Sequence, residues 1–302
     1  MQSIDFPTLL TIIYVLVDDW YKLNAPRLLK GQVGAKPIFS DSEVITLMLA
    51  IDFLAFESET QFLSFMRANY LELFPKLCDQ SQFNRRARSL RFIVEQLRRS
   101  WLEELGATKE LFLLMDTKPV PVVSYKRSKK RSDFRQSAGY GYCSARHFHY
   151  FGYKFVAVTT FSGLPVAFEM VAANTDERDA AFEVLSLLRS CDIFGDKGFI
   201  GAEWQQEVKE QTGNRVWTAK RVNQKEQNPV WFDQLLSSVR ERIEGSFNEL
   251  QNTGRNMERL LAKTVIGLTT RVIAKVTSYT LKQLLRHSFG LDVQTFQVAD
   301  AS

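Results

Sequence analysis

The sequence is poor in cysteine and histidine. Its 302 residues include three cysteines, which lie far apart, and three histidines, none of which falls at zinc-ligand spacing from a cysteine. This scarcity argues against a disulfide framework and against a structural zinc site. Because thiols stay reduced inside cells, the sequence predicts a protein of the cytoplasm.

Long hydrophobic runs are also missing. The longest early one, Leu9 to Val17, is too short to span a bilayer, has no basic residue ahead of it and ends at Asp18 and Asp19. We therefore expect neither a signal peptide nor a membrane helix. The chain does contain 45% hydrophobic and 12% aromatic residues, which is ample for the core of one large domain or two modest ones.

The net charge of +5 is modest, but the basic residues are clustered, and clustering favours a polyanionic partner. Residues 81–102 show this best, because their apolar positions recur every three or four residues and define one buried helical face. Six arginines lie opposite that face or flank it: Arg85, Arg86, Arg88, Arg91, Arg98 and Arg99. Either this helix contacts DNA or it is a solvated basic helix, and the spacing alone leaves both open.

Residues 1–107 are predicted to be helical, with the clearest start at FSDSEVITLMLA, where Ser40 and Glu43 have capping-box spacing. From about residue 108 the pattern changes to a strand (LFLLM), a hairpin over 149–174, and then helix, strand, helix, strand and a long helix near 231–252. This order predicts an α/β domain over 108–255, with a mixed sheet and helices on both faces. Residues 256–302 are expected to form a C-terminal helix that packs on this core.

Two aspartates are expected at the carboxyl ends of neighbouring strands. In CDIFGDKGFIG (191–201), Asp196 stands between two glycines where an apolar run stops, and Asp116 follows the run LFLLM. Open α/β sheets keep ligands at this edge, although a turn aspartate is the simpler explanation of Asp196. A third carboxylate should come from a helix crossing the edge. On the predicted helix 231–252 only Glu244 borders the apolar stripe, and it could also pair with Arg240.

Three carboxylates gathered at one place would repel one another unless cations lay between them. Hard oxygen ligands of this kind suit Mg²⁺ or Mn²⁺. Two such ions, about 3.5–4 Å apart, can activate a nucleophile and stabilise the leaving oxygen of an in-line displacement at phosphorus. The chemistry indicated is phosphodiester cleavage or strand transfer.

These residues resemble the DDE triad of bacterial insertion-sequence transposases. The motifs LLMDTKPVPV, IFGDKGFIG and RERIEGSFNEL look nearest to the insertion sequence 982 family, and the similarity is strong over about 110–252 and looser over 40–100. The resemblance implies an RNase H-like catalytic domain in which Asp116, Asp196 and Glu244 are the catalytic residues and the metal ligands. Ser237 and Gln251 stand where related enzymes often carry a tyrosine and a lysine, so the pattern does not say which side chains grip the terminal DNA.

The resemblance also implies an activity: metal-dependent cutting at the terminal inverted repeats of an insertion sequence, and joining of the freed 3′-hydroxyl ends to target DNA. The expected partner is double-stranded DNA rather than a membrane. The expected location is the bacterial cytoplasm, at the nucleoid. Because transposition joins two DNA ends, a homodimer is favoured. The expected DNA contacts are four arginines of the helical region and basic residues near the metal edge: Arg85, Arg86, Arg88, Arg91, Lys126, Arg127, Lys129, Lys130, Arg131, Lys197, Lys220, Arg221 and Arg240.

Two other functions stay open at this stage. One keeps the fold and the metals but makes the protein an RNase H-like, structure-selective nuclease. The other is a DNA-binding regulator, helix-turn-helix-like within residues 1–107, whose catalytic core has decayed. The intact triad argues against decay.

Overall fold

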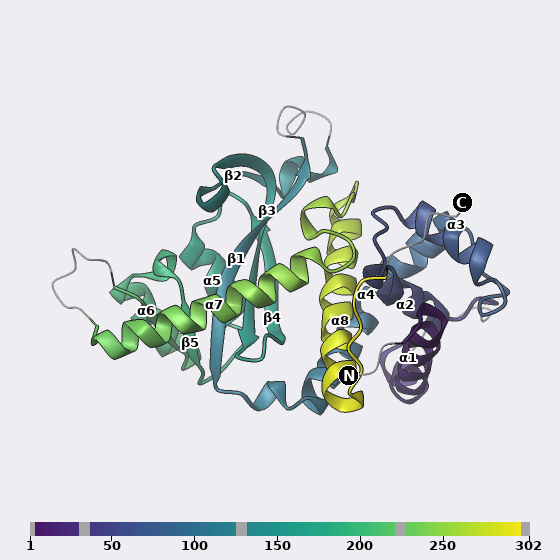
Figure 1. Ribbon diagram of the computed structural model, residues 1–302. Helices are drawn as coiled ribbons and strands as arrows, with labels where there is room; N and C mark the ends of the chain where they lie inside the picture. Colours follow the sequence, from purple (N-terminus) through teal and green to yellow (C-terminus); the bar gives the residue numbers. More distant parts are fainter. Residues whose placement is uncertain (1–3, 30–36, 125–131, 221–227, 297–302) are drawn as a thin grey trace. The chain divides into compact units, whose positions relative to one another are not determined.

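The computed structural model describes residues 4–29, 37–124, 132–220 and 228–296 (Figure 1). By their internal contacts the residues form two compact units. The helical unit comprises residues 1–105 and 250–302, and the α/β unit comprises residues 106–249. None of the helices within the described ranges combines the length and the hydrophobicity that a bilayer crossing requires.

The helical unit is built from capped, amphipathic helices. Ser40 and Glu43 form the expected capping box at the start of α2, and Asp79 and Thr264 accept backbone N–H groups at the starts of α4 and α8. The elements are α1 (Phe6–Leu28), α2 (Asp41–Ala50), η1 (Ile51–Phe53), α3 (Glu59–Asn69), α4 (Gln80–Glu104), η7 (Met257–Arg259) and α8 (Val265–Phe289).

Helix α4 buries the face that its spacing predicts, including Phe83, Leu90 and Trp101. It packs against α8, which is buried along most of its length. The last segment of the chain therefore packs on the N-terminal helices and belongs to their unit. The expectation of a C-terminal helix on the catalytic core differs from this arrangement, because hydrophobicity along α8 shows that it is buried but not which surface buries it.

A buried ion pair joins the two pieces of chain that make the helical unit. Arg255 donates from Nε to Asp52 Oδ1 over 3.0 Å and from Nη2 to Oδ2 over 2.9 Å. Their side chains are 3% and 2% exposed. Lys275 lies 3.9 Å from the same carboxylate and donates to the carbonyl oxygen of Thr253. Such a pair specifies the association strongly, because either partner alone would be a buried, unpaired charge.

The α/β unit holds one mixed sheet, as predicted. Its strands are β1 (Phe112–Val123), β2 (Gly139–Cys143), β3 (Phe148–Thr160), β4 (Pro165–Ala172), β5 (Asp192–Gly195) and β6 (Arg215–Thr218). The order is β2-β3-β1-β5-β6, with β4 also paired to β3. The β1–β5 and β5–β6 pairs are parallel, and the other pairs are antiparallel. The hairpin of β3 and β4 has the predicted turn at Ser162 and Gly163.

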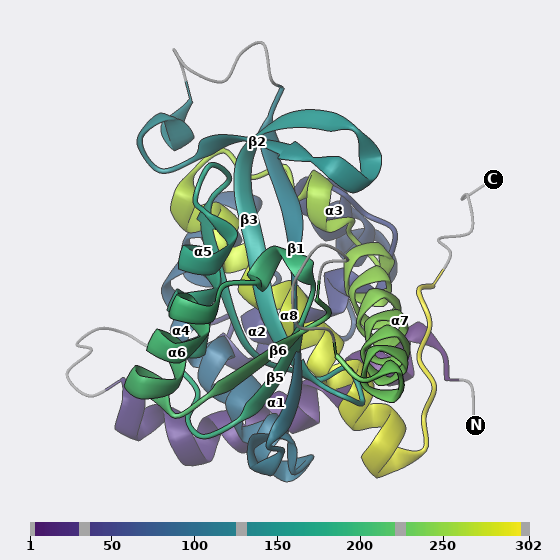
Figure 2. The same cartoon turned by 90° about the vertical axis from the view of Figure 1, so that its left-hand side faces the viewer.

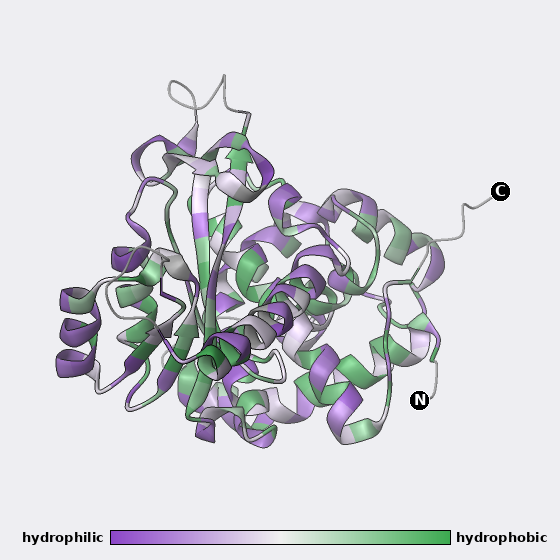
Figure 3. Ribbon diagram, turned by 60° about the vertical axis from the view of Figure 1, so that its left-hand side comes forward, coloured by the Kyte–Doolittle hydropathy of each residue, from purple (hydrophilic) through white to green (hydrophobic). Residues whose placement is uncertain are grey.

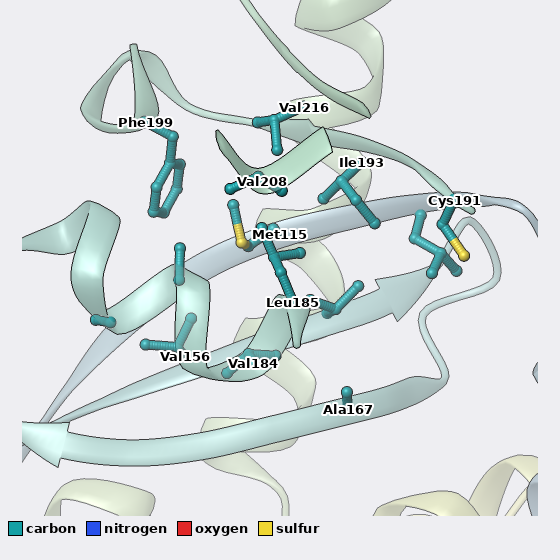
Figure 4. Packing of buried hydrophobic residues seen from close by; sticks show 14 residues of the cluster. Met115, Val156, Ala167, Val184, Leu185, Cys191, Ile193, Phe199, Val208 and Val216 are labelled. Atoms are coloured by element: carbon teal, nitrogen blue, oxygen red, sulfur yellow. The ribbon is translucent and has the colours of Figure 1, made fainter. Parts of the chain in front are cut away.

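Helices cover both faces of the sheet. Figure 2 shows α5 (Glu177–Leu185) and α6 (Ala202–Thr212) on one side and α7 (Val230–Asn252) on the other. Alternate residues of the strands form a core with α5 and α6, among them Met115, Val156 and Ile193 (Figure 4). In Figure 3 the green of the long strands is interrupted by purple positions, as the sequence of β1 changes from LLM to DTK. The predicted fold class, an α/β domain preceded by a helical region, is confirmed.

We expect Arg255→Met to lower the free energy of unfolding by about 3–5 kcal/mol, because the buried Asp52 carboxylate loses two hydrogen bonds and keeps only Lys275, 3.9 Å away, to balance its charge. The matched control is Arg259→Met in the same segment. Arg259 is 72% exposed and lies 3.5 Å from Glu57, so its loss should cost less than about 1 kcal/mol. Urea unfolding measures both, and equal losses would contradict a special role for the buried pair.

A second prediction concerns Lys275, whose pKa burial lowers to about 8 from an ordinary 10.5. Between these values the unfolded chain holds a proton that the folded chain does not, so this residue makes stability rise with pH, by up to about 1.4 kcal/mol per pH unit. The free energy of unfolding measured from pH 8 to 10.5 should therefore rise more steeply in the wild type than in Lys275→Met. Parallel curves would show that the lysine does not titrate there.

Candidate active site

The parallel pairing of β1 with β5 brings the two predicted aspartates together. Its register runs from Phe112 opposite Asp192 to Met115 opposite Gly195. The next residues along the two strands are Asp116 and Asp196. The prediction that they emerge side by side from neighbouring strands is confirmed, although they lie 80 positions apart in the sequence.

Asp116 falls on the sheet face that α7 covers. Leu113 and Met115 point into the core with α5 and α6, so Asp116, which alternates with them, points to the other face. Lys118, two residues further, confirms this side, because its Nζ lies 5.7 Å from the ring centre of Phe247 in α7. Asp196 is the first residue after β5, beside Asp116 at the end of the paired stretch.

Glycine before Asp196 is required by packing. A Cβ at Gly195 would lie 2.9 Å from Cδ2 of Phe199 and 3.5 Å from Cε of Met115, inside the core. A Cβ at Gly198 would lie 2.1 Å from Oε2 of Glu177 at the start of α5. The glycines flanking Asp196 therefore let the chain turn closely over the core, and this turn presents the aspartate at the sheet edge.

Asp116 does not end its strand, and in this respect the sequence prediction is wrong. Strand β1 continues to Val123 and stays paired with β3, whereas its partner β5 stops at Gly195. The end was predicted because the apolar run stops at Asp116, and the extension contains Pro119 and Pro121, which lack the N–H that an inner strand needs. Past Gly195 no described strand lies on that side of β1, so β1 becomes an edge where proline is tolerated.

The environment of Asp116 is polar and half-open. Its side chain is 24% exposed, and Oδ2 lies 3.9 Å from Nζ of Lys118. Oδ1 accepts the backbone N–H of Thr117 at 2.7 Å. Sequence reasoning missed Lys118, although its period-two spacing from Asp116 is the signal that places both on one face.

Glu244 lies on α7, three residues before Phe247. Phe247 is buried and packs edge-on against Phe155 of β3, with ring centres 6.3 Å apart. Glu244 itself is exposed, so it lies further from the buried face than the helical spacing predicted. The side chain of Arg240, its expected partner, lies outside the described residues.

The geometry offers two carboxylates for a metal ion rather than three. Within the described ranges no three carboxylate, histidine or cysteine side chains converge closely enough to hold an ion. Asp116 and Asp196 fit as two oxygen donors that follow the paired stretch of neighbouring strands. Glu244 has the right chemistry and lies on the helix over the sheet face that carries Asp116, but it does not form a cluster with them in this structure.

The expected DNA contacts divide into three groups. Arg86 is already engaged, because it donates to the carbonyl oxygen of Phe39 and forms an ion pair with Asp41. Arg98, which is not among the expected contacts, is 1% exposed and paired with Glu95. Arg85, Arg88 and Arg91 line one pocket on α4, and Lys220 is partly exposed just after β6. The other predicted contacts, or their side chains, lie outside the described residues: Lys126, Arg127, Lys129, Lys130, Arg131, Lys197, Arg221 and Arg240.

One protein family matches the α/β unit together with the residues that follow it. Residues 107–281 match the family described as transposase DDE domain, and the matched segment contains Asp116, Asp196 and Glu244. No curated protein and no solved structure matches the chain. Because the match covers more than half of the 302 residues, the chain belongs to the transposase DDE domain family.

Proposed function

We propose that this protein is a DNA transposase that cuts at the terminal inverted repeats of its own insertion sequence and joins the 3′-hydroxyl ends to target DNA. The family supports a transposase. The observation that carries the finer proposal is the parallel β1–β5 register, which sets Asp116 and Asp196 side by side beneath the helix that bears Glu244. The RNase H-like character of the domain and its relation to the insertion sequence 982 family belong to the same proposal.

Transposase DDE domains generally use divalent metal ions. In this chain Asp116 and Asp196 would hold Mg²⁺ or Mn²⁺, and Glu244 would complete the ligand set. Two bound ions would supply activation of a nucleophile and stabilisation of the leaving oxygen in displacement at phosphorus. Exposure of Glu244 keeps its carboxylate accessible to an ion and to DNA.

Lys118 has a positioning role in this proposal. Its ammonium lies 3.9 Å from Asp116 Oδ2 and 5.7 Å from the Phe247 ring centre, so it offsets negative charge at the aspartate and ties β1 to α7. If Asp116 held a metal ion, the ion would balance the charge of the carboxylate, and Lys118 would be available to a DNA phosphate.

The partner in this proposal is double-stranded DNA, and the joining of two element ends favours a homodimer. Regulation by DNA binding alone, with a decayed catalytic core, is the less favoured alternative, because the domain retains all three carboxylates in the matched segment. A structure-selective nuclease would cut unrelated DNA equally well and would not join ends. A joining assay on terminal-repeat and unrelated duplexes therefore separates these functions.

We expect Asp116→Asn, Asp196→Asn and Glu244→Gln to reduce cleavage of terminal-repeat DNA by at least about a hundredfold, since even groups that only support metal ligands are worth 10–100-fold. The matched control is Glu241→Gln, an exposed carboxylate on the same helix. It should keep activity within about twofold. A Glu244→Gln protein as active as Glu241→Gln would remove Glu244 from the site.

Calorimetric titration of Mn²⁺ tests the ligands without catalysis. With terminal-repeat DNA present, we expect the wild type to bind the ion and Asp196→Asn to lose most of that binding, because a neutral amide is a weaker ligand than a carboxylate. Identical titration curves would show that Asp196 is not a metal ligand and is only a residue of the turn.

A further inference from the structure

A pocket of about 670 Å³ opens beside the first half of α4, within the helical unit. Three of its lining residues are arginines on one face of the helix, Arg85, Arg88 and Arg91, and Ile266 closes it from the first turn of α8. The remaining lining residues are uncharged, so no carboxylate faces the pocket. Nothing in the proposed cutting chemistry uses this pocket.

The side chain of Arg88 contains a hydrogen-bond donor that has no acceptor. Its Nε is buried and has no hydrogen-bond partner. In the part of the chain that the structure describes, neither Arg88 nor Arg85 pairs with a carboxylate. A buried donor without an acceptor costs about 1–3 kcal/mol, more when it is charged. The side chain as a whole is partly exposed and lines the pocket, so a ligand there can reach the guanidinium and offset its charge.

The nearest buried carboxylate is already engaged elsewhere. Glu59 accepts from Asn84 at 2.8 Å and lies 2.9 Å from Arg271. Although burial acts to raise the pKa of Glu59, the attraction of Arg271 and the hydrogen bond from Asn84 outweigh it and lower the pKa. Glu59 is therefore an anion committed to Arg271, and it leaves the positive charge of Arg88 uncompensated.

The start of α8 adds to the positive potential of the pocket. This helix runs from Val265 to Phe289 and carries no acidic residue in its first turn. Gly267 lies against Arg88, since a Cβ there would be 3.4 Å from Nη2. The positive end of a long helix and a partly exposed guanidinium thus lie beside the same pocket, an arrangement that suits phosphate.

We propose that this pocket binds backbone phosphate of duplex DNA, with Arg88 as the anchor and Arg85 and Arg91 beside it. The proposal rests on the proposed DNA-cutting function and adds a second contact site, in the helical unit. Arg85 and Arg91 are six residues apart, which is about 9 Å along a helix. That length exceeds a single phosphate ion and suits successive phosphates of one strand.

The test compares Arg88→Met with Arg99→Met. Arg99 lies on the same helix, is 58% exposed and pairs with Glu95 at 3.1 Å, outside the pocket. Duplex affinity is measured by fluorescence anisotropy at several salt concentrations in EDTA. We expect Arg88→Met to bind at least about tenfold more weakly, with the slope of log affinity against log salt reduced by about 0.9, the value for one lost phosphate contact. Arg99→Met should stay within about twofold of the wild type.

Thermal unfolding without DNA separates this role from a structural one. Because Nε of Arg88 has no partner, Arg88→Met should unfold at the same temperature as the wild type or higher. Equal DNA affinity and slope for the two variants would overturn the proposal. So would a result in which inorganic phosphate stabilises the wild type but not Arg88→Met while their DNA affinities agree, since the ligand would then be a free anion.

The result of the DNA-binding test on Arg88→Met does not depend on whether the proposed active site is correct. Binding in EDTA excludes divalent metal, so a failure of the Asp116 and Asp196 variants to lose cleavage would refute the proposed active site and leave the pocket to be judged by Arg88 alone. Conversely, intact metal-dependent cleavage with unchanged binding by Arg88→Met would refute the pocket and leave the active site standing.

Discussion

The parallel hydrogen-bonded pairing of β1 with β5 is the interaction on which the candidate active site depends. It fixes which residues of two distant segments are neighbours, and a shift of one residue would turn one aspartate into the core. Close packing enforces the register, because Gly195 fits against Met115 and Phe199 only without a side chain. The packing of these apolar residues thus fixes the positions of Asp116 and Asp196.

The helical unit depends on a different kind of constraint. Hydrophobic burial along α4 and α8 is not directional, and many arrangements could satisfy it. The Asp52–Arg255 pair is directional, with two hydrogen bonds in a buried setting, and it selects one association of the N-terminal and C-terminal segments. In the same unit Arg88 is partly exposed and forms no ion pair within the described residues, in contrast to the fully buried and paired Arg255.

Local signals in the sequence were enough to predict much of this fold. Capping at Ser40, the turn at Ser162 and Gly163, and the apolar runs before Asp116 and Asp196 each depend on near neighbours, and each is found in the structure. Predictions failed where a distant partner decides. The extension of β1 depends on β3, and the packing of α8 depends on α4. Helical spacing placed Arg98 beside the buried face of α4. In the structure it is buried, because an ion pair with Glu95 balances its charge.

The proposed site was predictable to different degrees for its three carboxylates. The two aspartates follow strands, whose direction and alternation carry position over short distances. Glu244 depends on how a long helix lies over the sheet, and the apolar stripe fixes that rotation only coarsely. Lys118 was missed because a lysine two residues from an aspartate in a strand resembles any exposed charged pair.

The division of the helical unit between the two ends of the chain has a consequence for its biosynthesis. Ribosomes release a chain from its N-terminus, and segments that are complete fold as they emerge. The α/β unit is continuous over residues 106–249 and can close before synthesis ends, whereas α1 to α4 must wait for Arg255 and α8. The arginine pocket beside Ile266 therefore forms after the α/β unit, and a nascent chain acquires its three carboxylates before it acquires this positively charged surface.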